Sequence, residues 1–183
     1  MRPMFTIHVG EHLVGSYIEK KLKDFNVWVP SKDKGVDLLV TDSKNKKTVS
    51  LQVKFSKYFL VTHTEDRWQM GLKSCGWWTL NRDKIEQSSA DFWIFVLHSF
   101  INQKDIQYVI IKPEELLKKL TKLRGDVKTL SSYLWVTKKN KCWEARGLKK
   151  EKQILIANYM YNNEDRNFTN YLNNWELIRR KLK

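Results

Sequence analysis

Four residues in the first third of this 183-residue chain have chemical characters that do not suit their expected settings. Asp37 lies in the apolar stretch VDLLV, and strands disfavour a buried Asp unless a cation or hydrogen-bond donors meet its carboxylate. Gln52 and Lys54 are two apart in SLQVKFS, so both project from one face of a strand. Glu11 lies in the first turn of an expected helix. The chemical types of these four residues suit a site at which two carboxylates, an amide and an amine come together.

The elements that would hold these residues are one helix and two paired strands. Apolar residues at helical spacing predict a helix over 10–22, in which Gly15 would let another element approach closely. Strands are expected over 36–41 and 48–56, joined by the polar turn SKNKK. An antiparallel hairpin of these strands would bring Asp37 near Gln52 and Lys54.

These fragments, in this order, resemble the PD-(D/E)XK nuclease superfamily, which includes restriction endonucleases, archaeal Holliday-junction resolvases and Mrr-like enzymes. The matching segments are VGEHLVGSYIEKKL around Glu11, DKGVDLLV around Asp37, and SLQVKFSK with Gln52 and Lys54. The resemblance covers about the first 57 residues, and the rest of the chain carries no motif that we can place. It implies a restriction endonuclease-like α/β fold and metal-dependent hydrolysis of DNA by an endonuclease of restriction, resolvase or repair type.

The resemblance also implies a role for each residue. Asp37 would be the central ligand of Mg²⁺, or of Mn²⁺ as a substitute, together with the Gln52 amide oxygen or the Val53 backbone carbonyl. Glu11 would bind a second metal or a metal-bound water. Lys54 would orient the attacking water and stabilise charge on the phosphate. Gln52 departs from the acidic residue usual in the family, which removes one negative charge and should weaken metal affinity.

Nucleic-acid contacts are expected from basic residues outside these motifs. In the family pattern, Ser56 and Lys57 would hold a neighbouring phosphate. A second group of lysines and one arginine lies in and just after a predicted hairpin turn. It is the best candidate for phosphate contacts, and a solvated turn explains it nearly as well. That group comprises Lys138, Lys139, Lys141, Arg146, Lys149 and Lys150.

Each feature has a simpler interpretation. Asp37 alone is typical of an Asp bonded to nearby backbone, and Glu11 alone of a carboxylate at a helix N-terminus. Gln52 and Lys54 alone suit the solvated face of a strand. Two other functions therefore stay open: a catalytically weak or inactive nucleic-acid-binding module on a nuclease-like scaffold, and a basic structural protein.

The rest of the chain predicts one α/β domain over 1–183, with a mixed sheet flanked by helices and a helical C-terminal extension. Its core would span about 1–125, and a basic hairpin and C-terminal helices would occupy 126–183. The all-apolar run 92–97 predicts a central strand covered on both faces. Further strands are expected over 27–29, 76–80, 106–111, 133–136 and 142–145, and helices over 81–88, 113–125, 150–161 and about 168–182.

The net charge of +14 and pI near 9.7 favour a polyanionic partner, with nucleic acid, and DNA first, as the expected one. No apolar run is long enough to cross a membrane, and the first residues lack the features of a secretory signal. Two cysteines make no disulfide framework, so a reducing, cytoplasmic setting is expected. Cutting both DNA strands usually requires two sites, which favours a homodimer.

Overall fold

The computed structural model describes residues 8–31, 34–56, 70–98 and 106–183. A five-stranded sheet has the order β1-β2-β3-β5-β6, and a three-stranded sheet has the order β4-β7-β8. The elements are α1 (Val9–Lys21), β1 (Phe25–Trp28), β2 (Leu38–Asp42), β3 (Thr48–Ser56), β4 (Leu72–Asn81), α2 (Arg82–Glu86), β5 (Phe92–Leu97), β6 (Gln107–Ile111), α3 (Pro113–Arg124), β7 (Thr129–Thr137), β8 (Cys142–Glu144), α4 (Lys150–Ala157), the 3₁₀ turns η2 (Glu164–Arg166) and η3 (Thr169–Tyr171), and α5 (Glu176–Leu182).

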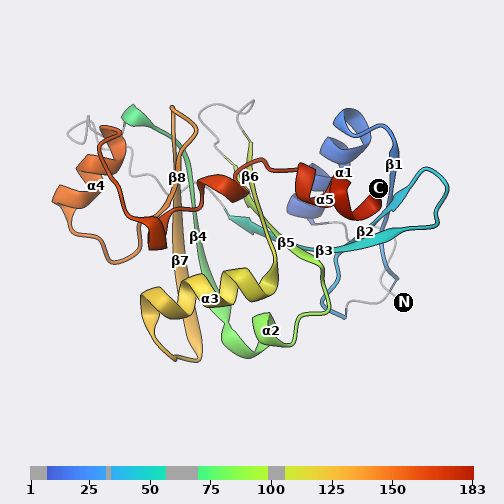
Figure 1. Cartoon of the computed structure of the whole chain (residues 1–183), viewed down its shortest axis with the longest axis horizontal. Helices are drawn as coiled ribbons and strands as arrows, with labels where there is room; N and C mark the ends of the chain where they lie inside the picture. The colour runs from blue at the N-terminus through green and yellow to red at the C-terminus, as the bar shows by residue number, and fades with distance from the viewer. Residues whose placement is uncertain (1–7, 32–33, 57–69, 99–105) are drawn as a thin grey trace.

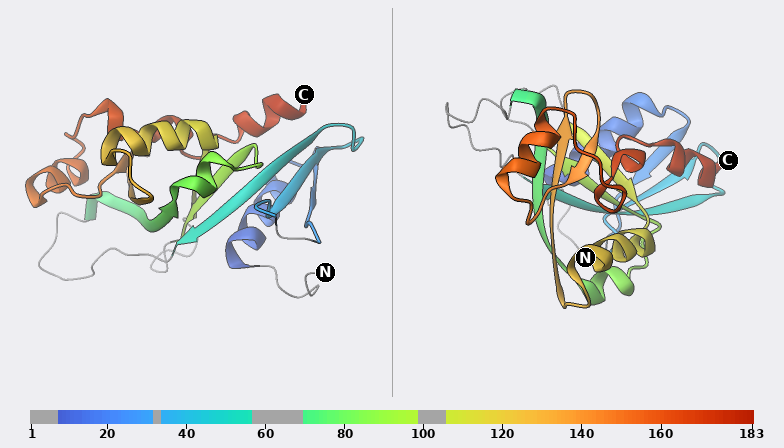
Figure 2. Two further views of the ribbon diagram at one scale, coloured as in Figure 1. Left: turned by 90° about the horizontal axis from the view of Figure 1, so that it is seen from below. Right: turned by 60° about the vertical axis from the view of Figure 1, so that its left-hand side comes forward.

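The predicted α/β class, with a mixed sheet flanked by helices and a helical C-terminal part, is confirmed. β3 and β5 run parallel, whereas the other neighbours in the larger sheet are antiparallel. α1 and α5 lie near each other beside β1 and β2, and α4 lies at the other end of the molecule with the smaller sheet (Figure 1). The elongated shape that results is clearest from below (Figure 2).

β5 is buried on both faces, as its uninterrupted apolar sequence predicts. Phe92, Ile94 and Val96 join one apolar cluster, to which α1 and α5 also contribute. The alternate residues, from Trp93 to Leu97, join a second cluster with α2, α3 and the smaller sheet. The strand next to it, β3, therefore has a fixed position at the centre of the fold.

β3 shows the alternation that positions the candidate site. Val49, Leu51 and Val53 are buried, and the residues between them, including Gln52 and Lys54, are only partly buried. The antiparallel pairing of β2 with β3 confirms the predicted hairpin, with Leu38 opposite Leu51. This pairing brings the residues just before β2 next to the second half of β3.

The smaller sheet was not expected from the sequence. The predicted strand 76–80 is the centre of the longer β4, which pairs along its length with β7 rather than with the larger sheet. The predicted hairpin around the turn KKNK is present as β7 and β8. β4 comes from the expected core and β7 from the expected extension, so the two segments share one sheet.

The prediction of one helix over about 168–182 is wrong. The segment forms η3, an extended stretch and then the shorter α5. Asn173 takes a left-handed conformation (φ 51°), and its side-chain oxygen accepts a hydrogen bond from the Tyr108 N–H at 2.9 Å. Leu172 also forms a bridge with Val109, so the segment covers the edge of β6. The apolar stripe is divided between the two faces of the sheet, because Phe168 joins one cluster and Trp175 the other.

Among the described residues, none of the helices has the length and apolar character that a membrane crossing requires.

Candidate active site

Glu11, Asp37, Gln52 and Lys54 line one cleft of about 780 Å³. They come from the start of α1, the segment before β2, and β3, so only the fold brings them together. Val53, whose backbone was expected to supply a carbonyl ligand, also lines this cleft. The convergence that the sequence predicted for these residues is therefore present in the structure.

Asp37 is fixed by the backbone of the neighbouring strand. Its side chain is 7% exposed, and Oδ2 accepts a hydrogen bond from the Val53 N–H at 2.7 Å. Its own N–H donates to the Leu51 carbonyl at 2.8 Å. Gly35, two residues earlier, has φ 82°, a left-handed conformation that favours glycine and turns the chain toward β2.

Glu11 is buried at the N-terminus of α1, with 4% of its surface exposed. Its Oε2 accepts a hydrogen bond from the His8 N–H at 3.4 Å, and the helix dipole favours a negative charge there. The close approach expected at Gly15 occurs instead at Gly10. A Cβ at Gly10 would lie 2.8 Å from the Cβ of Phe55, so glycine allows the start of α1 to pack directly on β3. A Cβ at Gly15 would lie 3.6 Å from Cγ1 of Val27, which is an ordinary van der Waals contact.

Lys54 extends from β3 toward the indole ring of Trp93 on β5. Its Nζ lies 5.1 Å from the ring centroid, within the range of a cation–π interaction. Trp93 also lines the cleft, although only 2% of its surface is exposed. The amine is therefore placed over the side of the cleft formed by β3 and β5.

Sequence reasoning missed part of the wall of the cleft. It consists of residues before β2 and around the end of α2, with two further lysines among them. Lys34 lies three residues before Asp37 and offered a signal through its place in the matching segment DKGVDLLV. Lys84 carried none, because only the packing of α2 brings it to the cleft. The residues of this wall are Lys34, Gly35, Lys84, Gln87, Ser88 and Ser89.

The donor set fits a magnesium ion that keeps several waters. Among the described residues there is no group of three or more His, Cys, Asp or Glu side chains that could hold a metal. The cleft instead offers two carboxylates, the Gln52 amide and the Val53 carbonyl. Mg²⁺ prefers oxygen ligands and is commonly held by one or two carboxylates with water and substrate oxygens. A site with this composition should bind the ion weakly in the absence of substrate.

The predicted nucleic-acid contacts lie apart from the cleft or outside the described residues. Ser56 is 4% exposed, and its Oγ accepts a hydrogen bond from the Trp77 N–H at 2.9 Å, so its hydroxyl joins β3 to β4. Lys57 lies outside the described residues. Within the described chain, the cleft is lined by none of the six basic residues of the hairpin region, namely Lys138, Lys139, Lys141, Arg146, Lys149 and Lys150.

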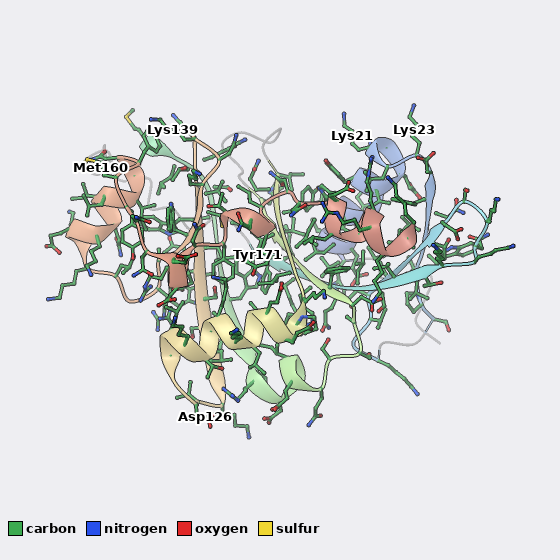
Figure 3. The ribbon with its side chains drawn as sticks, in the orientation of Figure 1. Lys21, Lys23, Asp126, Lys139, Met160 and Tyr171 are labelled. Carbon is green, nitrogen blue, oxygen red and sulfur yellow. The ribbon has the colours of Figure 1, made fainter. Side chains whose placement is uncertain are left out.

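Two of these six residues have aromatic neighbours in the half of the molecule that holds the smaller sheet. Lys139 lies 4.6 Å from the ring centroid of Tyr159, and the Arg146 guanidinium lies 4.3 Å from that of Trp77. In Figure 3, Lys139 is near Met160, far from Lys21 and Lys23 at the end of α1. The six residues, none of which is among the described residues that line the cleft, form a second basic group that we call the hairpin surface.

No known family model, curated protein or solved structure matches this chain.

Proposed function

We propose that this chain is a Mg²⁺-dependent nuclease that hydrolyses phosphodiester bonds of DNA. The observation that supports this most strongly is the convergence of Glu11, Asp37, Gln52 and Lys54 in one cleft. Four residues from three separate segments would share a cleft only rarely if each were a surface or capping residue. The net charge of +14 favours a polyanionic substrate.

The carboxylate of Asp37, the amide oxygen of Gln52 and the carbonyl of Val53 would hold the cation, and Glu11 would bind a second metal or a metal-bound water. When bound, Mg²⁺ or Mn²⁺ would neutralise charge on the reacting phosphate and make hydroxide available near neutral pH. The bond from the Val53 N–H to Asp37 Oδ2 orients this carboxylate before any substrate arrives. A ligand held in this way need not be ordered during the reaction.

Lys54 would stabilise the negative charge that develops on the phosphate and orient the attacking water. Its ammonium group is the cation nearest in sequence to the proposed ligands, one residue after Val53. Lys34 and Lys84, which also line the cleft, would contact phosphates next to the scissile bond. The cleft thus combines two carboxylates for the metal with three lysines for the phosphates.

A nucleic-acid-binding module without catalysis is the second candidate. The observation in its favour is the neutral Gln52 in a donor set to which the described residues contribute two carboxylates. It predicts salt-sensitive DNA binding and no hydrolysis with any divalent ion. A basic structural protein is less well supported, because Asp37 and Lys54 would then have no reason to share a cleft.

The proposed setting is the cytoplasm, with DNA as partner and a homodimer as the form that cuts both strands. Cys75 and Cys142 are buried free thiols, which suits a reducing compartment. Light scattering after size exclusion, with and without DNA, measures the oligomeric state. A protein that stays monomeric on DNA would contradict the dimer.

The decisive experiment measures cleavage of plasmid, branched and single-stranded DNA with Mg²⁺, with Mn²⁺ and with a chelator. We expect cleavage that the chelator abolishes, and a loss of at least about a hundredfold in Asp37→Asn and Lys54→Met. Asn at position 37 can still accept the Val53 hydrogen bond, so this variant should fold. Asp126→Asn and Lys118→Met change the same residue types at exposed positions outside the cleft and should keep full activity.

Two results would decide against the proposal. Undiminished cleavage in Asp37→Asn or Lys54→Met would show that the reaction occurs elsewhere. A wild-type protein that binds DNA in a salt-dependent way but never cuts it would favour the binding module.

A further inference from the structure

Trp93 lies beside the proposed ligands rather than only in the core. In the parallel pairing of β3 with β5 it is opposite Gln52, so its side chain leaves the same face of the sheet as Gln52 and Lys54. It belongs to the apolar cluster beneath that face and also lines the cleft. One side chain therefore connects the packed interior with the candidate site.

The orientation of this indole is fixed from two directions. Its N–H donates a hydrogen bond to Ser88 Oγ at 2.8 Å, and the same oxygen accepts from the Ala90 N–H at 3.3 Å. Close packing on the Phe95 side, with ring centroids 6.3 Å apart, restricts rotation of the ring. The ring face near the cleft is therefore a rigid surface.

Lys54 has four rotatable side-chain bonds, and holding its ammonium in one place costs conformational entropy. The face of an indole carries negative electrostatic potential and attracts a cation. With Nζ 5.1 Å from the ring centroid, the amine lies within the range of that attraction. The ring can thus limit the positions of the amine near the cleft.

We propose that Trp93 is a positioning residue for Lys54: the indole face holds the ammonium over the cleft, and Ser88 holds the indole. The placement of the amine stands on geometry alone, whereas its consequence for hydrolysis rests on the proposed nuclease function. Trp93 itself would not touch the reacting atoms. It would act on the rate only through Lys54.

The first test is a single-turnover cleavage assay combined with DNA affinity in the absence of metal. Trp93→Leu removes the ring face and should slow cleavage about tenfold, with affinity unchanged within about twofold. Trp93→Phe keeps a ring face and should retain most of the rate. Ser88→Ala removes the hydrogen bond to the indole N–H and should reduce the cleavage rate by an intermediate amount. These two milder variants keep the test valid should Trp93→Leu fail to fold.

A double-mutant cycle separates positioning from a general structural role. In a Lys54→Met background, Trp93→Leu should cause no further loss of the residual rate, because the amine it positions is gone. The chain provides a matched control in Lys119, whose Nζ lies 5.2 Å from the ring centroid of buried Phe168. Phe168→Leu removes a similar contact outside the cleft and should leave the cleavage rate of folded protein unchanged.

A second readout does not depend on activity. Lysine labelled with ¹³C at Cε gives one NMR signal for each lysine, and the signal absent in Lys54→Met belongs to Lys54. The indole ring current should shift its Hε protons upfield, and Trp93→Leu should remove this shift. A wild-type Lys54 signal without the shift would overturn the placement, and equal rate losses from Trp93→Leu in both backgrounds would overturn the positioning role. If the shift is present but the wild-type protein never cleaves, the nuclease function fails and the placement of the amine stands.

Discussion

At the scale of single residues, Asp37 combines two roles that sequence reasoning treated as alternatives. Its Oδ2 accepts a hydrogen bond from the backbone of β3, as expected of a structural Asp. It also lines the cleft with Glu11 and Gln52, as expected of a metal ligand. A carboxylate has enough lone pairs for both, and the hydrogen bond offsets part of the cost of burying the charge. A structural role at this position therefore supports the proposed site.

Gln52 provides the sharpest test of the metal set at this scale. Gln52→Glu adds the carboxylate that is usual in the resembled family, and affinity for a divalent ion rises with the charge of its ligands. We expect the Mg²⁺ concentration for half-maximal cleavage to fall about tenfold. Titration of the cleavage rate with Mg²⁺ measures this, and isothermal calorimetry measures the binding directly.

Gln87→Glu is the control for Gln52→Glu, since Gln87 lines the same cleft but lies at the end of α2 and is not among the proposed ligands. An equal gain in both variants would mean that added charge anywhere in the cleft attracts the ion. The proposed ligand role of Gln52 would then be lost.

At the scale of elements, the attachment of α5 shows how the C-terminal part supports β3. Asp91, just before β5, accepts hydrogen bonds from the Ser50 N–H at 2.8 Å and the Ser50 hydroxyl at 3.0 Å. It also forms an ion pair with Lys181 of α5. This one carboxylate therefore connects α5 and the segment before β5 to the strand that carries Gln52 and Lys54.

This connection makes stability depend on pH. Burial raises the pKa of Asp91, but hydrogen bonds from Lys181 and Ser50 outweigh it, and the net pKa lies below the usual range. The ionised carboxylate thus stabilises the fold above the unfolded pKa of about 4, and this contribution is lost as the pH falls through the lower folded value. Asp91→Asn should lower the free energy of unfolding at pH 7 by about 0.5–1 kcal/mol, given its partial exposure.

Urea unfolding from pH 7 down to pH 2 measures both effects for Asp91. The difference between the wild type and Asp91→Asn should shrink at acid pH, whereas Asp126→Asn, at an exposed ion pair with Arg82, should show a smaller difference throughout. If the free energies of unfolding of the wild type and Asp91→Asn differed by the same amount at every pH, the charge of Asp91 would not be the cause of its contribution to stability.

The elements that the sequence predicted well are those in which the local pattern of apolar and polar residues is compatible with one type of secondary structure. The alternation in 48–56 and the apolar run 92–97 were each predicted with the observed bounds. The smaller sheet and the interrupted C-terminal segment were not, because both depend on partners distant in sequence. Asn173, for example, leaves the helical conformation to bond with Tyr108, sixty-five residues away. The same holds at the site, where a motif predicted the ligands but only the packing of α2 brings Lys84 to them.

At the scale of the whole molecule, the charge of +14 is not concentrated at the cleft. Among the described residues, the cleft has three lysines against two carboxylates, and the hairpin surface, outside the lining of the cleft, holds six further basic residues. Long-range attraction of DNA depends on the summed field, whereas hydrolysis depends on groups at the reacting phosphate. The two basic surfaces should therefore affect binding and cleavage differently.

Two sets of substitutions test this difference. Replacing Lys138, Lys139 and Lys141 by Gln should weaken DNA binding. The slope of log affinity against log salt should become shallower by about 0.9 for each phosphate that the protein no longer neutralises. The cleavage rate of bound DNA should change little. Replacing Lys34 and Lys84 by Gln should instead slow cleavage of bound DNA about tenfold or more, because these lysines line the same cleft as the proposed metal ligands. Affinity measured over a range of salt concentrations and single-turnover rates at saturating protein separate the two effects. A loss of rate from the hairpin set equal to that from the cleft set would mean that DNA reaches the cleft only through the hairpin surface, so that the two surfaces form a single path.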